Sequence, residues 1–380
     1  MINNFLRFYT YLIIRFLSKR QHTTKFCNMM LIIISVILTS CNSKNPTNAH
    51  AKTHNPNIIL LIGDGMGLSE LSAAYYYGDS KSNFSRFNEI GLINTSSAKH
   101  KITDSGAGGT AFSCGVKTFN GAIGVNSDSV STPNIVEVLS KINYNTGVIS
   151  TSAITHATPA CFYAHVVNRG RQNDIAMQLV NSEIDFFAGG GTSYFTDRKD
   201  SLNLIKKLES NGFIINTKDN LENFNGKYGF LLAKGGMPTM LESRGDFLPN
   251  YTKIALDYFS KKKAPFFLMV EGSQIDWAGH ENNSEYLIAE LLDFDKTVGI
   301  AMDFAEKNKN TLVIVLADHE TGGFTLAANG DDYNSIKPVF STGGHSTTLI
   351  PVLAFGPGAN NFKGIYQNNE VFNRLLLDIK

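Results

Sequence analysis

The sequence has few cysteines, and they do not form a cluster. Four occur in 380 residues, and two of them, Cys27 and Cys41, lie near the N-terminus. Cys114 and Cys161 remain for the rest of the chain and could form one disulfide bond at most. Zinc sites built from thiolates need several closely spaced cysteines, so the sequence excludes such a site. Any metal ion must therefore be held by carboxylates, histidines and hydroxyl groups.

An excess of charge of one sign is also absent. The 34 lysines and arginines nearly balance the 33 aspartates and glutamates, and the basic residues are scattered. Proteins that bind nucleic acids usually concentrate basic residues on one face, so we expect no nucleic-acid-binding surface. The 43% of hydrophobic residues and the 33 glycines are typical of a folded protein with many tight turns. We expect one large domain rather than a disordered chain.

Hydrophobic runs long enough to cross a membrane are lacking too. The apolar stretch from Met29 to Thr39 spans about eleven residues, whereas a membrane-spanning helix needs roughly 20. It follows several basic residues and ends in Leu-Thr-Ser-Cys, which resembles a bacterial lipobox with Cys41 as the lipidated residue. These features predict an exported protein of the periplasm or cell envelope. Its contact with a membrane would be a lipid anchor at Cys41.

The same features divide the chain into three parts. Residues 1–41 are predicted to be a leader with an export signal, although the segment before the apolar stretch is unusually long for such a signal. Residues 42–54 are rich in polar side chains and are predicted to form a flexible tether. Residues 55–380 are predicted to fold as a single domain.

From Ala51 onward, short apolar runs alternate with longer amphipathic segments. This pattern predicts an α/β fold with a mostly parallel central sheet and helices on both faces. The helical period is strongest from Ser284 to Glu306, so we expect that helix to pack on the sheet. The clearest predicted strands are Asn57–Ile62, Thr146–Ser150, Phe266–Val270, Thr311–Leu316 and Pro351–Phe355.

Acidic and histidine residues follow four of the predicted strands. Asp64, Glu271 and the pair Asp318 and His319 come directly after apolar runs, and His156 follows a fourth run after a few residues. A single aspartate in such a place is usually a helix cap or a turn residue. In an open α/β sheet, however, ligands bind beyond the carboxyl ends of the strands. Four such strands together predict a ligand site at one edge of the sheet.

Further candidate metal ligands lie elsewhere in the chain. Asp276 and His280 are four residues apart, so one helical turn would place both on the same face. A hydrogen-bonded surface pair is the alternative interpretation of that spacing. His345 lies in a glycine-rich segment that allows close approach of a ligand. Together with Asp318 and His319, these side chains form a ligand set suited to zinc or another divalent ion.

The stretch from Thr103 to Ala111 places Ser105 in front of small residues that can begin a helix. The N-terminus of a helix favours an anion, which suits a phosphate group or a serine alkoxide. A simple N-cap serine is the alternative, but a metal ion could activate this hydroxyl without a neighbouring base. Arg169 carries a planar guanidinium that could hold two phosphate oxygens, although most arginines only lie on the surface.

In this order the motifs resemble those of the alkaline phosphatase family across nearly all of residues 57–358. The resemblance implies a three-layer α/β sandwich and a single catalytic domain over residues 55–380. The matching segments are Ile62-Gly63-Asp64-Gly65-Met66-Gly67, Thr103-Asp104-Ser105-Gly106-Ala107, His156-Ala157-Thr158-Pro159 with Arg169, Glu271-Gly272 with Asp276 and His280, Asp318-His319-Glu320-Thr321-Gly322-Gly323, and Gly344-His345.

The resemblance also implies a site with two zinc ions and one magnesium ion. By matching position, Asp276, His280 and His345 would hold one zinc, Asp64, Ser105, Asp318 and His319 would surround the second, and Asp64, Thr158 and Glu271 would hold magnesium. Ser105 would attack the phosphorus of a phosphate monoester and form a phosphoserine, and water would then release inorganic phosphate. Arg169 would bind the nonbridging phosphate oxygens.

Two positions depart from the pattern of some family members. Those members have an aspartate and a lysine where this chain has His156 and Trp277. His156 could be a direct ligand, so that the third site would either prefer zinc or be less selective for magnesium. Trp277 cannot bring a charge to phosphate and would shape the pocket. The interval from His319 to His345 has room for only a small excursion. The family usually forms homodimers, so a homodimer is expected.

Three alternatives remain beside a phosphomonoesterase. A phosphodiesterase of the same fold is the nearest, although Thr158 and Glu271 favour retention of the third metal, which such enzymes typically lack. A sulfatase is disfavoured, because Ser105 is followed by glycine and alanine rather than by the sulfatase motif. An envelope lipoprotein that binds phosphate without catalysis would be expected to lack the nucleophile or a ligand, and this chain has all of them.

Overall fold

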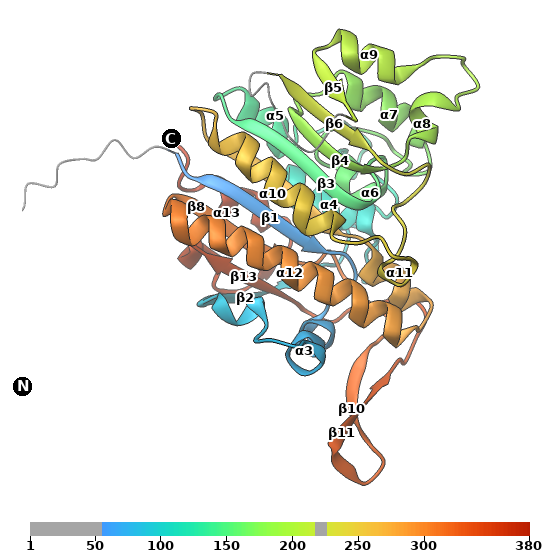
Figure 1. Cartoon of the computed structure of the whole chain (residues 1–380), viewed down its shortest axis with the longest axis vertical. Coiled ribbons are helices and arrows are strands. Elements are labelled where there is room, and N and C mark those ends of the chain that lie inside the picture. The colour runs from blue at the N-terminus through green and yellow to red at the C-terminus, as the bar shows by residue number, and fades with distance from the viewer. Residues whose placement is uncertain (1–54, 217–225) are drawn as a thin grey trace, which may run out of the picture. The chain divides into compact units, whose positions relative to one another are not determined.

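A ten-stranded sheet forms the centre of the computed structural model, which describes residues 55–216 and 226–380 (Figure 1). The strand order is β14-β2-β13-β8-β1-β7-β3-β4-β6-β5. Neighbouring strands are parallel except at β13, which runs antiparallel to both β8 and β2. The strands are β1 Asn57–Gly63, β2 Glu89–Asn94, β3 Asn145–Ala153, β4 Phe186–Gly190, β5 Phe213–Ile215, β6 Lys227–Leu231, β7 Phe266–Gly272, β8 Thr311–Leu316, β13 Ile350–Phe355 and β14 Gly364–Gln367.

Two short antiparallel ribbons lie outside this sheet. Strand β9 (Glu320–Thr321) pairs with β12 (His345–Ser346), so the two segments around His319 and His345 are held side by side. Strands β10 (Thr325–Asn329) and β11 (Asp332–Val339) form a hairpin that extends away from the sheet (Figure 1). The small excursion expected between His319 and His345 is this hairpin.

Helices cover both faces of the sheet. Figure 1 shows α10 and α12 lying across the face nearer the viewer, and α12 contacts β1, β7 and β8. On the other face, α5 and α6 contact β3, and α4 packs against α6 and α13. The helices are α3 Leu68–Tyr77, α4 Ser105–Cys114, α5 Ile135–Ser140, α6 Ala157–Ala160, α7 Gln172–Val180, α8 Ser193–Thr196, α9 Leu204–Ser210, α10 Phe247–Ser260, α11 Gln274–His280, α12 Ser284–Asn308 and α13 Glu370–Leu376, with 3-10 turns η1 Asn83–Arg86, η2 Met240–Glu242 and η3 Ala359–Phe362.

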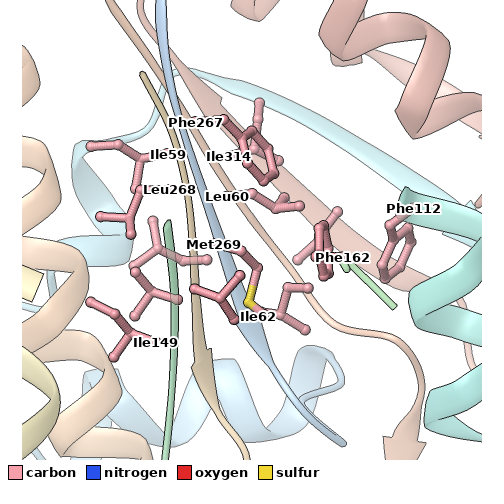
Figure 2. Packing of buried hydrophobic residues seen from close by; sticks show 14 of the residues in the cluster. Ile59, Leu60, Ile62, Phe112, Ile149, Phe162, Phe267, Leu268, Met269 and Ile314 are labelled. Carbon is pink, nitrogen blue, oxygen red and sulfur yellow. The ribbon is translucent and has the colours of Figure 1, made fainter. Parts of the chain in front are cut away.

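The central strands are buried on both faces, which explains their nearly continuous apolar sequences. Ile59, Leu60 and Ile62 of β1 are fully buried, as are Leu268 and Met269 of β7. Figure 2 shows these side chains on both sides of the strands, packed among residues of neighbouring elements. Apolar burial of this extent fixes the positions at which the strands end, and therefore the positions of the residues that follow them.

The predicted α/β fold with a mostly parallel sheet between helices is confirmed. All five predicted strands are present, and β3 is longer than predicted because it continues to Ala153. The predicted helix from Ser284 is α12, which begins after the N-cap Asn283 and ends at Lys309 in a left-handed conformation. Within the described residues, Cys114 and Cys161 are both buried free thiols and do not form the one disulfide that the sequence allowed.

The leader, the lipobox residue Cys41 and the tether over residues 42–54 lie outside the described residues. Their predicted roles, and the division of the chain that includes them, remain predictions. Among residues 55–216 and 226–380, no helix is both long enough and apolar enough to cross a membrane.

Candidate active site

Four adjacent parallel strands end at the same edge of the sheet and carry the predicted site residues there. In the order β8-β1-β7-β3, these strands pair in parallel through their whole central region. Asp318 and His319 follow β8, and Asp64 follows β1. Glu271 is the last residue but one of β7. The Asp64 amide donates to the carbonyl of Gly272, 3.2 Å away, which ties the ends of β1 and β7 together.

Three groups of side chains at this edge have the geometry of cation sites. In each group the candidate ligand atoms lie within 4.8 Å of one another. Asp64 belongs to two of the groups, so its carboxylate could bridge two ions. The groups are Asp276, His319 and His345; Asp64, Asp318 and His319; and Asp64, His156 and Glu271.

His280 joins the first of these groups from helix α11. Its Nε2 atom lies 3.1 Å from Nε2 of His345 and 3.4 Å from an oxygen of Asp276. The Nδ1 atoms of the two rings lie 2.8 Å from the carbonyls of Gly343 and Thr103. A carbonyl only accepts, so each neutral ring donates through Nδ1 and presents a bare Nε2. With both rings neutral, two bare nitrogens face each other at 3.1 Å, an arrangement that a cation bound between or beside them would stabilise.

His319 is oriented by Thr321 in the same manner. The Thr321 hydroxyl donates to Asp276 at 2.5 Å, and so it accepts from Nδ1 of His319 at 3.1 Å. The Nε2 atom of His319 is then bare and lies 3.5 Å from Oγ of Ser105. Imidazoles that bind metals are commonly held through their other nitrogen in this way.

Several buried polar atoms at the site find no hydrogen-bond partner among the described residues. Buried polar groups are nearly always hydrogen-bonded, so such a concentration indicates that something other than protein binds there. All but one of these atoms are carboxylate or hydroxyl oxygens of residues that the sequence predicts as metal ligands, and such oxygens fit divalent cations. The atoms are both Oδ atoms of Asp64, Oδ2 of Asp318, Oε1 of Glu271, Oγ1 of Thr158 and Nδ1 of His156.

The electrostatics of the site also favour bound cations. Burial, and then the neighbouring carboxylates of Asp318 and Asp276, raise the pKa of Asp64 well above its usual value. Burial raises the pKa of Glu271 to about 7, although Ser150 and Ser273 donate hydrogen bonds to it. Burial also lowers the pKa of His319 to about 3, so its imidazole is neutral at neutral pH and can bind a metal.

Ser105 is the first residue of helix α4, and Asp104 rather than Ser105 is its N-cap. The Asp104 carboxylate accepts from the amide of Ala107 at 3.0 Å. The alternative interpretation of Ser105 as a simple N-cap is therefore wrong. Ser105 is buried, and its hydroxyl lies among the candidate ligands. Small residues let α4 approach them, because a Cβ atom at Gly108 would lie only 2.8 Å from Cβ of Asp318.

Arg169 lies beside Ser105 through its ion pair with Asp104, with Nη1 2.9 Å from Oδ2. Its Nη2 atom lies 3.2 Å from Nε2 of His156. Hydrogen bonds from backbone amides and the charge of Arg169 lower the pKa of Asp104 despite its burial. The ring of Trp277 packs edge-on against that of His156, with centroids 6.0 Å apart. All predicted site residues of the described chain therefore lie in one cluster or against it.

Sequence reasoning assigned no role to several residues that orient the cluster. Asp104 holds Arg169, Thr321 orients two predicted ligands, and Ser150 donates to Glu271 at 2.5 Å. Thr321 stands two residues after His319, a spacing that places both side chains on one side of an extended segment. Asp104 directly precedes a run of small residues, which is the signal of an N-cap.

Comparisons with known proteins agree with this geometry. The family model described as alkaline phosphatase matches residues 55–339. Alkaline phosphatase 3 of Bacillus subtilis is 34% identical, over 85% of this chain and 90% of its own length. The alkaline phosphatase of Escherichia coli is 30% identical, over 83% of this chain and 84% of its own length.

Solved structures show the same fold. The alkaline phosphatase of the Antarctic bacterium TAB5 is 54% identical, covers 85% of this chain and 98% of its own, and superimposes with a TM-score of 0.83. Two variants of that enzyme, in which one histidine is replaced by aspartate or by glutamate, hold bound magnesium and are 52% identical with a TM-score of 0.82, covering 86% of this chain and 98% of their own. This chain belongs to the alkaline phosphatase family, whose metal-dependent enzymes hydrolyse phosphate monoesters.

Proposed function

We propose that this chain hydrolyses phosphate monoesters through a phosphoserine at Ser105, beside two zinc ions and one magnesium ion. The observation that carries the proposal is the position of the Ser105 hydroxyl. It lies at the N-terminus of a buried helix, 3.5 Å from a bare imidazole nitrogen of His319. Carboxylate oxygens that find no partner among the described residues surround the same place. The expected nucleophile and cation ligands are thus concentrated at one point.

The donor types support an assignment of the ions. Asp276, His280 and His345 would hold one zinc, and Asp64, Ser105, Asp318 and His319 the second, because mixed nitrogen and oxygen ligands suit zinc. Asp64, Thr158 and Glu271 offer oxygen alone, which suits magnesium. When bound, the ions would stabilise charge on the phosphate oxygens and activate water.

The side chains of the protein would perform the remaining steps. Oγ of Ser105 forms a bond to phosphorus as the bond from phosphorus to the alcohol oxygen breaks, and the alcohol leaves with a proton that balances the one lost by the serine hydroxyl. Water then attacks the same phosphorus, which restores Ser105 and releases inorganic phosphate. Arg169, fixed by Asp104, would bind the nonbridging oxygens, and amides of α4 would add further donors.

His156 and Trp277 would form the border of the site on the side of Arg169. The pKa of His156 is lowered to about 3 by burial and by Arg169, so the ring is neutral. Arginine only donates, so His156 accepts at Nε2 and carries its proton on Nδ1. Direct coordination by Nδ1 would require that proton to move and the contact with Arg169 to change. His156 therefore links the third cation group to the phosphate clamp.

The homodimer remains a prediction, and helix α3 offers a surface for it. Leu68, Tyr75 and Tyr76 are 53%, 49% and 66% exposed. Their spacing of seven and eight residues places them on one side of the helix. Helix α3 also contacts β10 of the extended hairpin. A cluster of large apolar side chains beside an extended ribbon is typical of a surface that a partner covers.

We propose export to the periplasm or cell envelope, with lipidation at Cys41, from the sequence pattern of the leader alone. Cys41→Ser should release the full chain from membranes, which fractionation of cells measures. Unchanged attachment to membranes in this variant would contradict the lipid anchor.

The first test compares a chromogenic phosphate monoester with its diester analogue, using protein that begins after the tether. We expect monoesterase activity that is lost on chelation and returns with zinc and magnesium, because all three groups of ligands need their ions. Activity on the diester alone would favour the related phosphodiesterases. No activity on either substrate by folded, metal-loaded protein would contradict the proposed function.

Replacement of the nucleophile gives the second test. Ser105→Ala should reduce kcat by at least about a thousandfold, because the covalent step is lost while the other ligands remain. Acid-quenched reactions with labelled substrate should leave phosphate on the unmodified protein and none on the variant. Ser113→Ala, in the same helix, is the matched control. A Ser105→Ala protein that keeps most of its activity would remove Ser105 from this role.

The third test addresses the selectivity of the oxygen-rich group. His156→Asp should increase the apparent affinity for magnesium by about tenfold, because a carboxylate suits magnesium better than an imidazole does. The Antarctic enzyme binds magnesium in two variants in which a histidine is replaced by aspartate or by glutamate, which agrees with this chemistry. His156→Asn is the matched control, because asparagine has the same size as aspartate but carries no charge. Equal magnesium dependence of the two variants would contradict the proposal.

The fourth test concerns assembly. Tyr76→Lys should raise the dissociation constant of the dimer by at least about tenfold, because a charge would enter an apolar contact. Sedimentation over a range of concentrations measures this change. Ile142→Lys, which alters another exposed apolar side chain outside α3, should leave the dissociation constant unchanged. Monomeric unmodified protein at all concentrations would contradict the dimer itself.

A further inference from the structure

Residues 233–245, here called the strap, cross the structure between β6 and α10 and pass beside the candidate active site. The strap is fixed at its start, where the Ala233 carbonyl accepts from the amides of Gly191 and Thr192 at 2.9 and 3.0 Å, and at two further places. At the first, the Met237 amide donates to the carbonyl of Thr151 at 3.0 Å, and the Met237 carbonyl accepts from Nε2 of Gln274 at 2.8 Å. Gln274 also accepts from the hydroxyl of Tyr286. The strap is thus joined to β3, α11 and α12.

The second of the two further places is a buried ion cluster. Nη2 of Arg244 lies 2.6 Å from Glu290 and 2.8 Å from Asp293, both on α12. The side chains of these three residues are 0%, 2% and 1% exposed. Glu290 also accepts from the amide of Met240 in the strap. Loss of the carboxylates would leave the buried arginine with an uncompensated charge, and loss of the arginine would do the same to the carboxylates. This attachment is therefore strong and specific.

Directly before the attachment at Met237, the strap lies against Trp277. A Cβ atom at Gly236 would lie only 2.6 Å from Cη2 of the indole, so the backbone of the strap touches the ring. Trp277 in turn contacts His156, and His156 contacts Arg169. A continuous series of contacts therefore runs from the Arg244 cluster to the residue that would bind phosphate.

We infer that the strap, held by Arg244, positions Trp277 and through it His156 and Arg169, so that Arg244 is a positioning residue for phosphate binding. The part of this inference that concerns phosphate rests on the proposed function. The placement of Trp277 does not, because it can be measured without activity. A rigid border of this kind would keep the guanidinium of Arg169 aligned for two phosphate oxygens.

Trp277 is the only tryptophan of the chain, so intrinsic fluorescence reports on this place directly. The primary comparison uses two adjacent glycines. Gly236→Ala places a methyl group against the indole, whereas at Gly235 no described atom lies within 4 Å of the Cβ position. We expect Gly236→Ala to shift the emission maximum and increase quenching by acrylamide. It should also raise KM and the inhibition constant for inorganic phosphate by about three- to tenfold. Gly235→Ala should change none of these.

The second comparison tests the attachment. Arg244→Lys keeps the charge but loses the planar fork that bridges two carboxylates, so it should change the fluorescence and KM in the same direction. Arg86 is the matched control, since it also binds two acids of α12, Asp303 and Glu306, but at the far end of the helix. Arg86→Lys should lower thermal stability without changing Trp277 emission or KM.

Unchanged emission in both Gly236→Ala and Arg244→Lys would overturn the inference, whatever the activity. A shifted emission with unchanged KM and phosphate inhibition in an active enzyme would overturn the link to phosphate. A shifted emission in Gly236→Ala with unchanged emission in folded Arg244→Lys would remove Arg244 from this role. If Arg244→Lys does not fold, the glycine pair still decides whether the strap positions Trp277. Absence of phosphatase activity in the unmodified protein would contradict the proposed function and leave the fluorescence comparison valid.

Discussion

The burial of Asp64, Glu271 and Asp318 at one edge of the sheet is the constraint on which the rest of the structure depends. All three side chains are fully buried, and each presents at least one oxygen that finds no partner among the described residues. Transfer of an unpaired carboxylate into a protein interior is among the most unfavourable changes in folding. Bound cations would offset this cost, so metal affinity and the stability of the fold are linked in this chain.

The architecture brings these carboxylates together without strain in the strands themselves. Parallel pairing of β8, β1, β7 and β3 gives the four strands a common end, and apolar side chains on both faces fix their register. Helix α4 approaches this end because Gly108 leaves room for Asp318. The N-terminus of α4 then adds a positive potential where an anion would react. The same packing that stabilises the core therefore sets the distances of the site.

The fold and the main site residues could be predicted from the sequence because their signals are local. An apolar run followed at once by an acid, as at Asp64 and Asp318, identifies both the strand and its end. The residues that sequence reasoning missed depend on partners distant in the chain. Arg244 is separated from Glu290 by 46 residues and from Asp293 by 49, and no spacing in the sequence connects them. Thr321 is intermediate, because its contact with His319 two residues earlier is local, whereas its contact with Asp276 lies 45 residues away in the chain.

Hydrogen-bond direction distinguishes the third cation group from the other two. His280, His319 and His345 each use Nδ1 to donate outward, so their bare Nε2 atoms face the site and suit a cation. His156 has the opposite arrangement, because its Nε2 accepts from Arg169 and its proton lies on Nδ1. A ring in that state repels a cation at Nδ1 and instead offers a donor to water or to a carboxylate. Binding of a cation at Nδ1 and acceptance from Arg169 at Nε2 would therefore require opposite tautomers of His156. A side chain without that proton, such as an aspartate, would make the binding of a cation independent of the alignment of Arg169.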